Sequence, residues 1–319
     1  MDALIPIADL QPIYSVAEVD RALGDGVAKR NEGLKSWYDR MRELGGSRYI
    51  IKPSTCESVN DLYATSPNFE AVVDDLRKCL ALAVSGNEAV QFTPILLLGE
   101  PGLGKTYFAK RLAQALATGF EFVSMSSLTA GWVLTGASAQ WHNARPGKVA
   151  QTLIDGDYAN PVVVLDEVDK AGGDARYDPM GALYGLLERD TAMHFKDEFI
   201  DVDMDASHIL WIATANDEGS IPEPILNRMN VYPIERPDAD GARRIALAVY
   251  HEILDAHHWR FPPDPSEGVL DKLAAVAPRD MRKLLLDAFG TAQLAGRDRL
   301  LPDDIDSRKL CGRRARMGF

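Results

Sequence analysis

The chain has 319 residues, of which 46% are hydrophobic and 26% are charged, and these values are typical of a soluble globular protein of about two domains. It contains no apolar run near the roughly 18 residues that a membrane helix needs, and its N-terminus lacks the basic start and apolar core of a signal peptide. We therefore expect no association with a membrane. The net charge of −12 argues against broad electrostatic attraction to nucleic acid, although a local basic patch would be compatible with it.

The three cysteines, Cys56, Cys79 and Cys311, lie far apart in the sequence and in no metal-binding spacing. An odd number of widely separated cysteines is typical of free thiols in a reducing compartment. We therefore expect a cytoplasmic protein.

Residues 1–65 predict a helical N-terminal segment that is separate from the rest of the chain. Ser15-Val-Ala-Glu18 is a capping-box pattern that opens a helix toward Leu23. Residues 34–44 predict a second helix, which ends at Gly45-Gly46. We find no residues with an evident chemical role in this segment.

Residues 66–236 predict a nucleotide-binding α/β domain, in which short apolar segments alternate with helical patterns. The predicted strands are 94–98, 121–125, 161–165, 208–214 and 231–234. Such alternation is typical of a parallel sheet covered on both faces by helices.

Residues 237–319 contain only helical patterns and predict a small all-α domain. These patterns are at 240–256, 266–276 and 279–295, with a short one after Pro302. The fold class is thus α/β, followed by a helical domain.

The most informative motif is Gly99-Glu-Pro-Gly-Leu-Gly-Lys-Thr106, a G-x-x-x-x-G-K-T pattern between a predicted strand and a predicted helix. In that context the pattern holds nucleotide phosphates, because its glycines let backbone N–H groups turn inward and the helix N-terminus adds partial positive charge. Lys105 would reach the β- and γ-phosphates of ATP or GTP, and the Thr106 hydroxyl would bind Mg²⁺. The other binding residues of the loop are Glu100, Pro101, Gly102, Leu103 and Gly104.

Carboxylates end the apolar segment Pro161-Val-Val-Val-Leu165. Ligands collect at the carboxyl ends of strands in an open parallel sheet, so Asp166 and Glu167 are expected beside the phosphate loop. Asp166 would hold Mg²⁺, usually through water, and Glu167 would act as the general base on the attacking water. A run of acids on a solvated loop is the alternative.

Asn216 follows the next buried strand, in His208-Ile-Leu-Trp-Ile-Ala-Thr-Ala-Asn216. A neutral amide at this position can hydrogen-bond the attacking water or the γ-phosphate without adding negative charge. Asparagine in a turn is otherwise usually structural.

Roughly residues 66–305 carry, in this order, a phosphate loop, Leu-Asp-Glu-Val-Asp, Ala-Thr-Ala-Asn and a helical lid. This series of motifs resembles that of the AAA+ ATPases. Within that superfamily the chain is most similar to the ATPase module of Lon-type proteases, in residues 160–170, 221–229 and 145–147. The resemblance implies ATP and Mg²⁺ as cofactors, residues 99–106 as Walker A, Asp166 and Glu167 as Walker B, and Asn216 as sensor 1.

The resemblance also implies two functional arginines. Arg228, in Leu-Asn-Arg-Met, matches the arginine finger that reaches the nucleotide of a neighbouring subunit, and Arg236 is the alternative. Arg279 matches sensor 2, which reaches back from the lid to the nucleotide. Here the preceding residue is Pro278, a departure from the family pattern, and Arg282 lies near the same helical face.

Trp141 matches the aromatic residue of a pore loop that grips an extended polypeptide in ring-forming unfoldases. The alignment rests on Pro146-Gly147, whereas the triplet Trp141-His142-Asn143 departs from the family's aromatic–aliphatic–glycine triplet. An exposed tryptophan supplies a large contact area at low entropic cost. The alternative is that Trp141 packs in the core.

The resemblance predicts an ATPase that forms a homo-oligomeric ring, expected to be a hexamer, and remodels or unfolds a protein. It ends with the lid, so we expect no peptidase activity in this chain. A nucleic-acid-associated AAA+ loader is a second hypothesis, disfavoured by the net charge of −12. An ATP-dependent switch that does not thread polypeptide is a third, and a monomeric phosphotransferase is a fourth.

Overall fold

The computed structural model describes residues 7–24, 28, 31–127, 131–141, 143–171, 180–306 and 308. The chain divides into two compact units. Unit 1 comprises residues 1–59, 74–98 and 109–233, and unit 2 comprises residues 60–73, 99–108 and 234–319. Cys311 and His142, which were considered above, lie outside the described residues.

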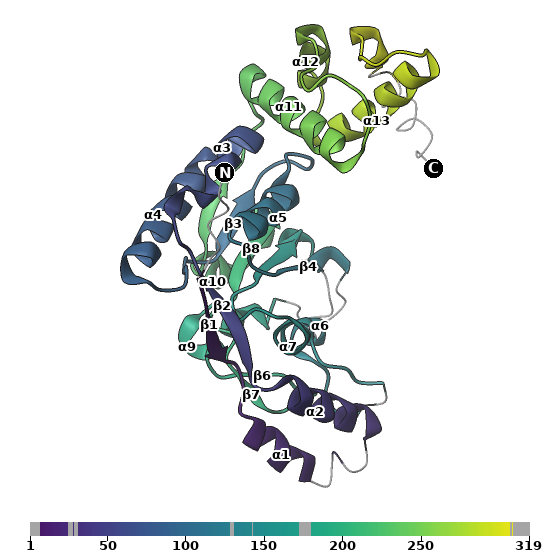
Figure 1. The fold of residues 1–319 in the computed structure, drawn as a ribbon. Coiled ribbons are helices and arrows are strands. Elements are labelled where there is room, and N and C mark those ends of the chain that lie inside the picture. Colours follow the sequence, from purple (N-terminus) through teal and green to yellow (C-terminus); the bar gives the residue numbers. More distant parts are fainter. Residues whose placement is uncertain are drawn as a thin grey trace. The chain divides into compact units, whose positions relative to one another are not determined.

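A five-stranded parallel sheet forms the centre of unit 1 (Figure 1). Its strands, in spatial order, are β4 (Phe120–Ser124), β5 (Val162–Asp166), β8 (Leu210–Ala215), β3 (Ile95–Leu98) and β9 (Asn230–Pro233). The first strand in sequence, β3, therefore lies between the fourth and the fifth. These strands confirm the predicted α/β fold and its five apolar segments.

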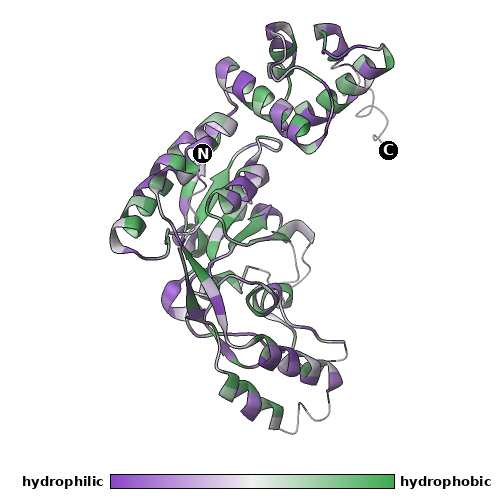
Figure 2. Cartoon of the chain, in the orientation of Figure 1, coloured by the Kyte–Doolittle hydropathy of each residue, from purple (hydrophilic) through white to green (hydrophobic). Residues whose placement is uncertain are grey.

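The inner strands are buried because they carry almost only aliphatic residues. All six residues of β8 are buried, and so are the first four of β5. Strands covered on both faces have such continuous apolar runs. Figure 2 accordingly shows hydrophobic colouring along β3 and β8.

Helices of unit 1 connect these strands. Those after the N-terminal segment are α6 (Trp132–Thr135), α7 (Lys148–Asp155), α8 (Leu183–Leu186), α9 (Arg189–Ala192) and α10 (Glu223–Leu226). The helices α4 (Glu70–Gly86) and α5 (Lys105–Ala115) have residues in both units. Strands β6 (Phe195–Lys196) and β7 (Asp203–Met204) form a short antiparallel pair.

The N-terminal segment, expected to be helical and separate, contributes strands to unit 1 as well. Its elements are β1 (Ile7–Pro12), α1 (Val16–Gly24), α2 (Glu32–Leu44) and β2 (Ser47–Lys52), and β1 pairs with β2 in antiparallel register. Leu34, Tyr38 and Met41 of α2, at helical spacing, are buried in the core cluster that also contains residues of β5 and β8. This segment is therefore part of the core of unit 1.

Unit 2 contains α3 (Asp61–Thr65), α11 (Ala239–Ala256), α12 (Glu267–Ala274) and α13 (Pro278–Leu294). The last three confirm the predicted helical patterns, and Figure 2 shows hydrophobic and hydrophilic residues alternating along them. Tyr250, Leu273 and Phe289 belong to their shared core. None of the helices in the described ranges combines the length and apolar character needed to cross a membrane.

Candidate nucleotide site

The phosphate loop has backbone conformations that require glycine. It follows the last residue of β3 directly, and Gly102 and Gly104 have φ angles of +89° and +91°. A Cβ at Gly99 would lie 2.3 Å from the carbonyl oxygen of Ile234. Only glycine combines these φ values with such close backbone approach at low cost, so the loop has the backbone path of a phosphate cradle.

Lys105 is the first residue of α5, and it is only 8% exposed. Its Nζ donates to the carbonyl oxygens of Gly99 and Glu100, the latter at 3.0 Å. Thr106 follows it and is half-buried. A buried ammonium at the start of an 11-residue helix suits a triphosphate, since both the charge and the helix N-terminus favour an anion.

The remaining predicted loop residues differ in exposure. Pro101 is exposed, whereas Leu103 is buried. Glu100 accepts from Arg236 through Nε at 3.0 Å and Nη2 at 2.6 Å, with both side chains largely exposed. Arg236, the alternative finger, therefore contacts the phosphate loop of its own chain.

The structure separates the two candidates for sensor 2. Arg279 lies over the phosphate loop, because a Cβ placed on Gly102 would be 2.9 Å from its Cδ. Arg282 instead donates to Glu252 of α11 at 2.9 Å. Within unit 2 it is therefore Arg279 that reaches the loop.

In unit 1, a threonine contacts both predicted Walker B residues, through the side chain of Asp166 and the backbone of Glu167. The Thr214 hydroxyl donates to Asp166 Oδ1 at 2.8 Å and accepts from the Glu167 backbone N–H at 3.0 Å. Thr214 is only 1% exposed. Glu167 has a left-handed conformation, with φ +57°, and its carboxylate pairs with Lys170, which raises the pKa of that lysine.

A third carboxylate fixes the predicted sensor 1 segment. Asp169 Oδ2 accepts the backbone N–H groups of Asn216 at 3.1 Å and Asp217 at 3.3 Å. The prediction from sequence missed Asp169, Thr214 and Lys170, although all three lie within or beside the motifs considered. The roles of Thr214 and Asp169 depend on the pairing of β5 with β8, where Leu165 lies opposite Ala213, whereas Lys170 pairs with Glu167 three residues away in the sequence.

The residues that could hold Mg²⁺ are few, as is usual for this ion. Within the described parts of the chain, no group of three or more His, Cys, Asp or Glu side chains is arranged to hold a metal. Mg²⁺ commonly takes one or two protein carboxylates together with substrate phosphates and waters. Asp166 of unit 1 and Thr106 of unit 2 each carry oxygens of the kind that such an ion takes.

Arg228, the predicted finger, has partners within its own chain. Its guanidinium donates to the Pro224 carbonyl at 2.6 Å and to Glu188 at 3.0 Å, and it lies 5.7 Å from the ring centroid of Tyr184. Its Nε is buried and has no hydrogen-bond partner. Its side chain is 30% exposed.

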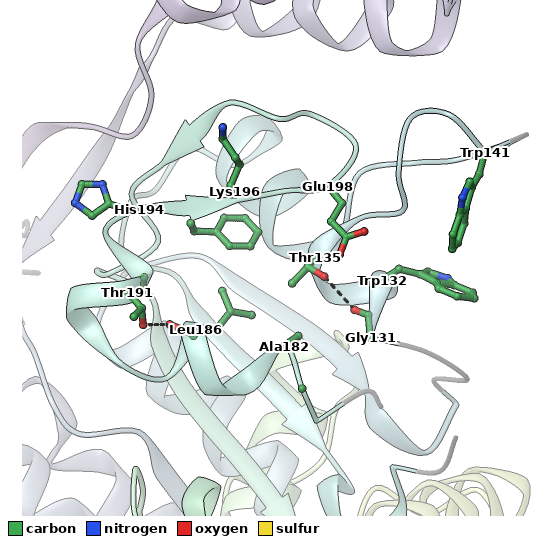
Figure 3. A pocket seen from close by; sticks show the side chains of 14 residues that line it. Gly131, Trp132, Thr135, Trp141, Ala182, Leu186, Thr191, His194, Lys196 and Glu198 are labelled. Carbon is green, nitrogen blue, oxygen red and sulfur yellow. Dashed lines mark hydrogen bonds between the residues drawn. The ribbon is translucent and has the colours of Figure 1, made fainter. Parts of the chain in front are cut away.

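Trp141 is 51% exposed, which excludes the alternative that it is a core residue. It borders a pocket of about 640 Å³ in unit 1 (Figure 3). The rings of Trp132 and Trp141 meet edge to face, with centroids 5.6 Å apart. Figure 3 shows this pair at one end of the pocket and His194 at the other.

Parts of this sequence and of its fold match known proteins. Residues 95–234 match the family model "ATPase family associated with various cellular activities (AAA)". This part of the chain is similar to that family. The match runs from the start of β3 to just beyond β9, and thus includes the phosphate loop, Asp166, Glu167 and Asn216.

The relatives include Lon proteases. The chain is 35% identical to the Lon protease of Malacoplasma penetrans over 220 residues, which are 68% of this chain and 28% of the relative. It is 36% identical to Lon protease 2 of Sorangium cellulosum over 250 residues, 73% of this chain and 30% of the relative. The chain thus spans less than a third of either relative.

A solved structure supports the fold. Hsp104, in a closed state with ATPγS and FITC casein, matches with a TM-score of 0.60 and 17% identity, over 75% of this chain and 48% of that one. An identity this low supports the fold alone.

Proposed function

We propose that this chain is an ATP-hydrolysing motor that remodels or unfolds a protein substrate and acts as a ring. The observation that carries hydrolysis is the network in which Thr214 and Asp169 fix Asp166, Glu167 and the Asn216 backbone at the carboxyl ends of β5 and β8. Strand β3, from which the phosphate loop continues, is paired with β8. Carboxyl ends of parallel strands share one edge of a sheet, which is where nucleotides bind.

In the proposed site the residues have separate roles. Lys105 and the loop amides bind the phosphates, Thr106 and Asp166 hold Mg²⁺, and Glu167 takes the proton from the attacking water. Bound Mg²⁺ would neutralise phosphate charge. The fixed backbone of Asn216 would aim its amide at the water or γ-phosphate.

Arg279 of the lid and Arg228 would add positive charge to the proposed site. We assign Arg279 to the nucleotide of its own chain, since it lies over Gly102. Arg228 would act on the nucleotide of a neighbouring subunit, after releasing Glu188, and this dependence on a neighbour favours a hexameric ring. We place the ring in the cytoplasm, because the described cysteines, Cys56 and Cys79, are free thiols.

Trp141 is the proposed contact with the substrate. Its exposure and its place on a loop suit transient binding of successive side chains along an extended polypeptide. Peptidase activity belongs to the Lon relatives by name, and we propose remodelling without proteolysis for the chain described here.

Two variants test hydrolysis. Lys105→Ala should abolish nucleotide binding, measured with a fluorescent ATP analogue, because the main phosphate cation is lost. Glu167→Gln should bind ATP normally and hydrolyse it at least about 100-fold more slowly, as expected for loss of a general base. Undiminished binding by the first variant would refute the site.

Images of the Glu167→Gln protein with ATP test the ring. A closed ring with density for polypeptide in its pore would support the proposal. The matched variant Arg228→Ala should bind ATP normally, while its turnover loses its dependence on protein concentration. Normal, concentration-dependent turnover in this variant would refute a site shared between subunits.

A further inference from the structure

A buried carboxylate lies outside the nucleotide site. Asp197, just after β6, has no exposed surface. Its Oδ2 accepts the Gly147 backbone N–H at 2.7 Å, and its Oδ1 accepts those of Phe199 at 2.9 Å and Ile200 at 3.0 Å. Burial raises the pKa of Asp197 to about 6, against the effect of these N–H groups. Because three backbone donors hold it, this side chain has a single well-defined position.

Asp197 lies at the stem of the loop that carries Trp141. Gly136 has a φ of +81°, and a Cβ there would be 2.3 Å from Asp197 Oδ1. A Cβ at Gly147 would be 2.4 Å from the Gly136 nitrogen, so the two ends of the loop touch. The Ala137 N–H donates to the Arg145 carbonyl at 3.2 Å and closes the stem. One carboxylate thus contacts both ends of loop 137–146.

Helix α2 of the N-terminal segment contacts the same loop from another side. Asn31 caps α2 by accepting the Leu34 N–H at 3.1 Å, and its Nδ2 donates to the Ala139 carbonyl at 2.9 Å. Two helical turns further, the Tyr38 hydroxyl donates to the Ile200 carbonyl at 2.7 Å. One face of α2 therefore holds both the loop and the turn that Asp197 organises.

We propose that Asn31, Tyr38 and Asp197 are positioning residues that hold the stem of loop 137–146 on unit 1, so that Trp141 transmits force to a polypeptide. Ala137 and Gly147 at the stem are buried and donate hydrogen bonds, whereas Trp141 is exposed. A side chain that pulls on a polypeptide must be attached to a rigid stem, because a flexible stem would move in place of the polypeptide. In this proposal the N-terminal segment has a function, which is to hold the loop in place. The proposal rests on the proposed remodelling function.

The test uses the double variant Asn31→Ser/Tyr38→Phe. Serine remains a good N-cap, so Asn31→Ser removes the bond to Ala139 and keeps the cap of α2. Tyr38→Phe removes only the hydroxyl. Asp197→Asn is the more drastic variant, and the double variant keeps the test valid if that one does not fold. Tyr49→Phe, at a tyrosine that is 53% exposed in β2, is the matched control.

Two readouts are compared in the full chain. The first is hydrogen–deuterium exchange of amides 137–145, and the second is stimulation of ATP hydrolysis by casein as an unstructured polypeptide. We expect exchange in the loop to rise at least tenfold in the double variant and casein stimulation to fall to the level of Trp141→Ala. Basal hydrolysis and the midpoint of unfolding should stay within error of Tyr49→Phe.

The outcomes are distinguishable. If the loop amides of the double variant exchange at the wild-type rate, the proposed positioning role is overturned, whatever the stimulation by casein. Raised exchange with full casein stimulation would also overturn it, provided that Trp141→Ala loses stimulation. If Trp141→Ala keeps full stimulation, the proposed role of this loop in remodelling fails, and loop exchange alone then decides whether the three residues hold the stem.

Discussion

Thr214→Val offers a sharp test of the site, because it removes one hydroxyl from a residue that is only 1% exposed and leaves the side-chain shape nearly unchanged. The variant loses the 2.8 Å bond to Asp166 and leaves the Glu167 N–H without its acceptor at 3.0 Å. A hydrogen bond to a charged group together with an unsatisfied donor corresponds to about 3 kcal/mol. We expect that loss in the free energy of unfolding, measured in urea.

The effect on hydrolysis should be at least as informative. Asp166 and Glu167 would no longer share a fixed partner, so turnover should fall at least about tenfold, which corresponds to about 1.4 kcal/mol of transition-state stabilisation. The affinity for ATP, measured by calorimetry, should change by less than about threefold, because the phosphate loop supplies most binding contacts. Thr214→Ser, which keeps the hydroxyl, is the control. Wild-type stability and turnover in Thr214→Val would refute the reasoning.

Three further predictions concern individual side chains. Arg279→Ala should weaken ATP binding about tenfold or more, whereas Arg282→Ala should leave it nearly unchanged; equal losses in titrations of both variants would contradict the assignment of sensor 2. Asp169→Asn should slow steady-state hydrolysis at normal ATP affinity, since the Asn216 backbone loses a charged acceptor, and unaltered turnover would count against this role. Pairing with Arg297 lowers the pKa of Asp304, so its ion pair stabilises unit 2 above pH 3.8, the usual carboxyl pKa, and this contribution disappears as the pH falls through the lowered value. Asp304→Asn should therefore destabilise unit 2 by about 1–3 kcal/mol at pH 7 and progressively less below pH 3.8, and a penalty independent of pH would refute this linkage.

Much of the fold was predictable because its signals are local. An apolar run bounded by turn residues indicates a buried strand wherever it lies, and all five runs of the central sheet are strands in the structure. The phosphate loop was predictable for a similar reason, since a continuous stretch of eight residues carries its glycines, lysine and threonine. The acidic end of β5 and the polar end of β8 were identified because each directly follows an apolar strand.

The N-terminal segment was less predictable. Its helices follow from capping and periodicity, whereas β1 and β2 pair with each other across the two helices between them. Such pairing between distant segments leaves no local pattern in either strand. For the same reason the sequence did not indicate that α2 packs in the core of unit 1.

The sequence by itself determined the nucleotide chemistry that we propose for this protein, because the residue types expected to bind phosphate and activate water lie in short continuous motifs. Only the tertiary structure decided which residues support them. Thr214 and Asp169 bind residues of a neighbouring strand or of the turn after it. Arg279 rather than Arg282 lies over Gly102. Asp197 contacts both ends of the loop that carries Trp141. These contacts join residues far apart in sequence, and the path of the chain alone brings them within hydrogen-bonding distance or van der Waals contact.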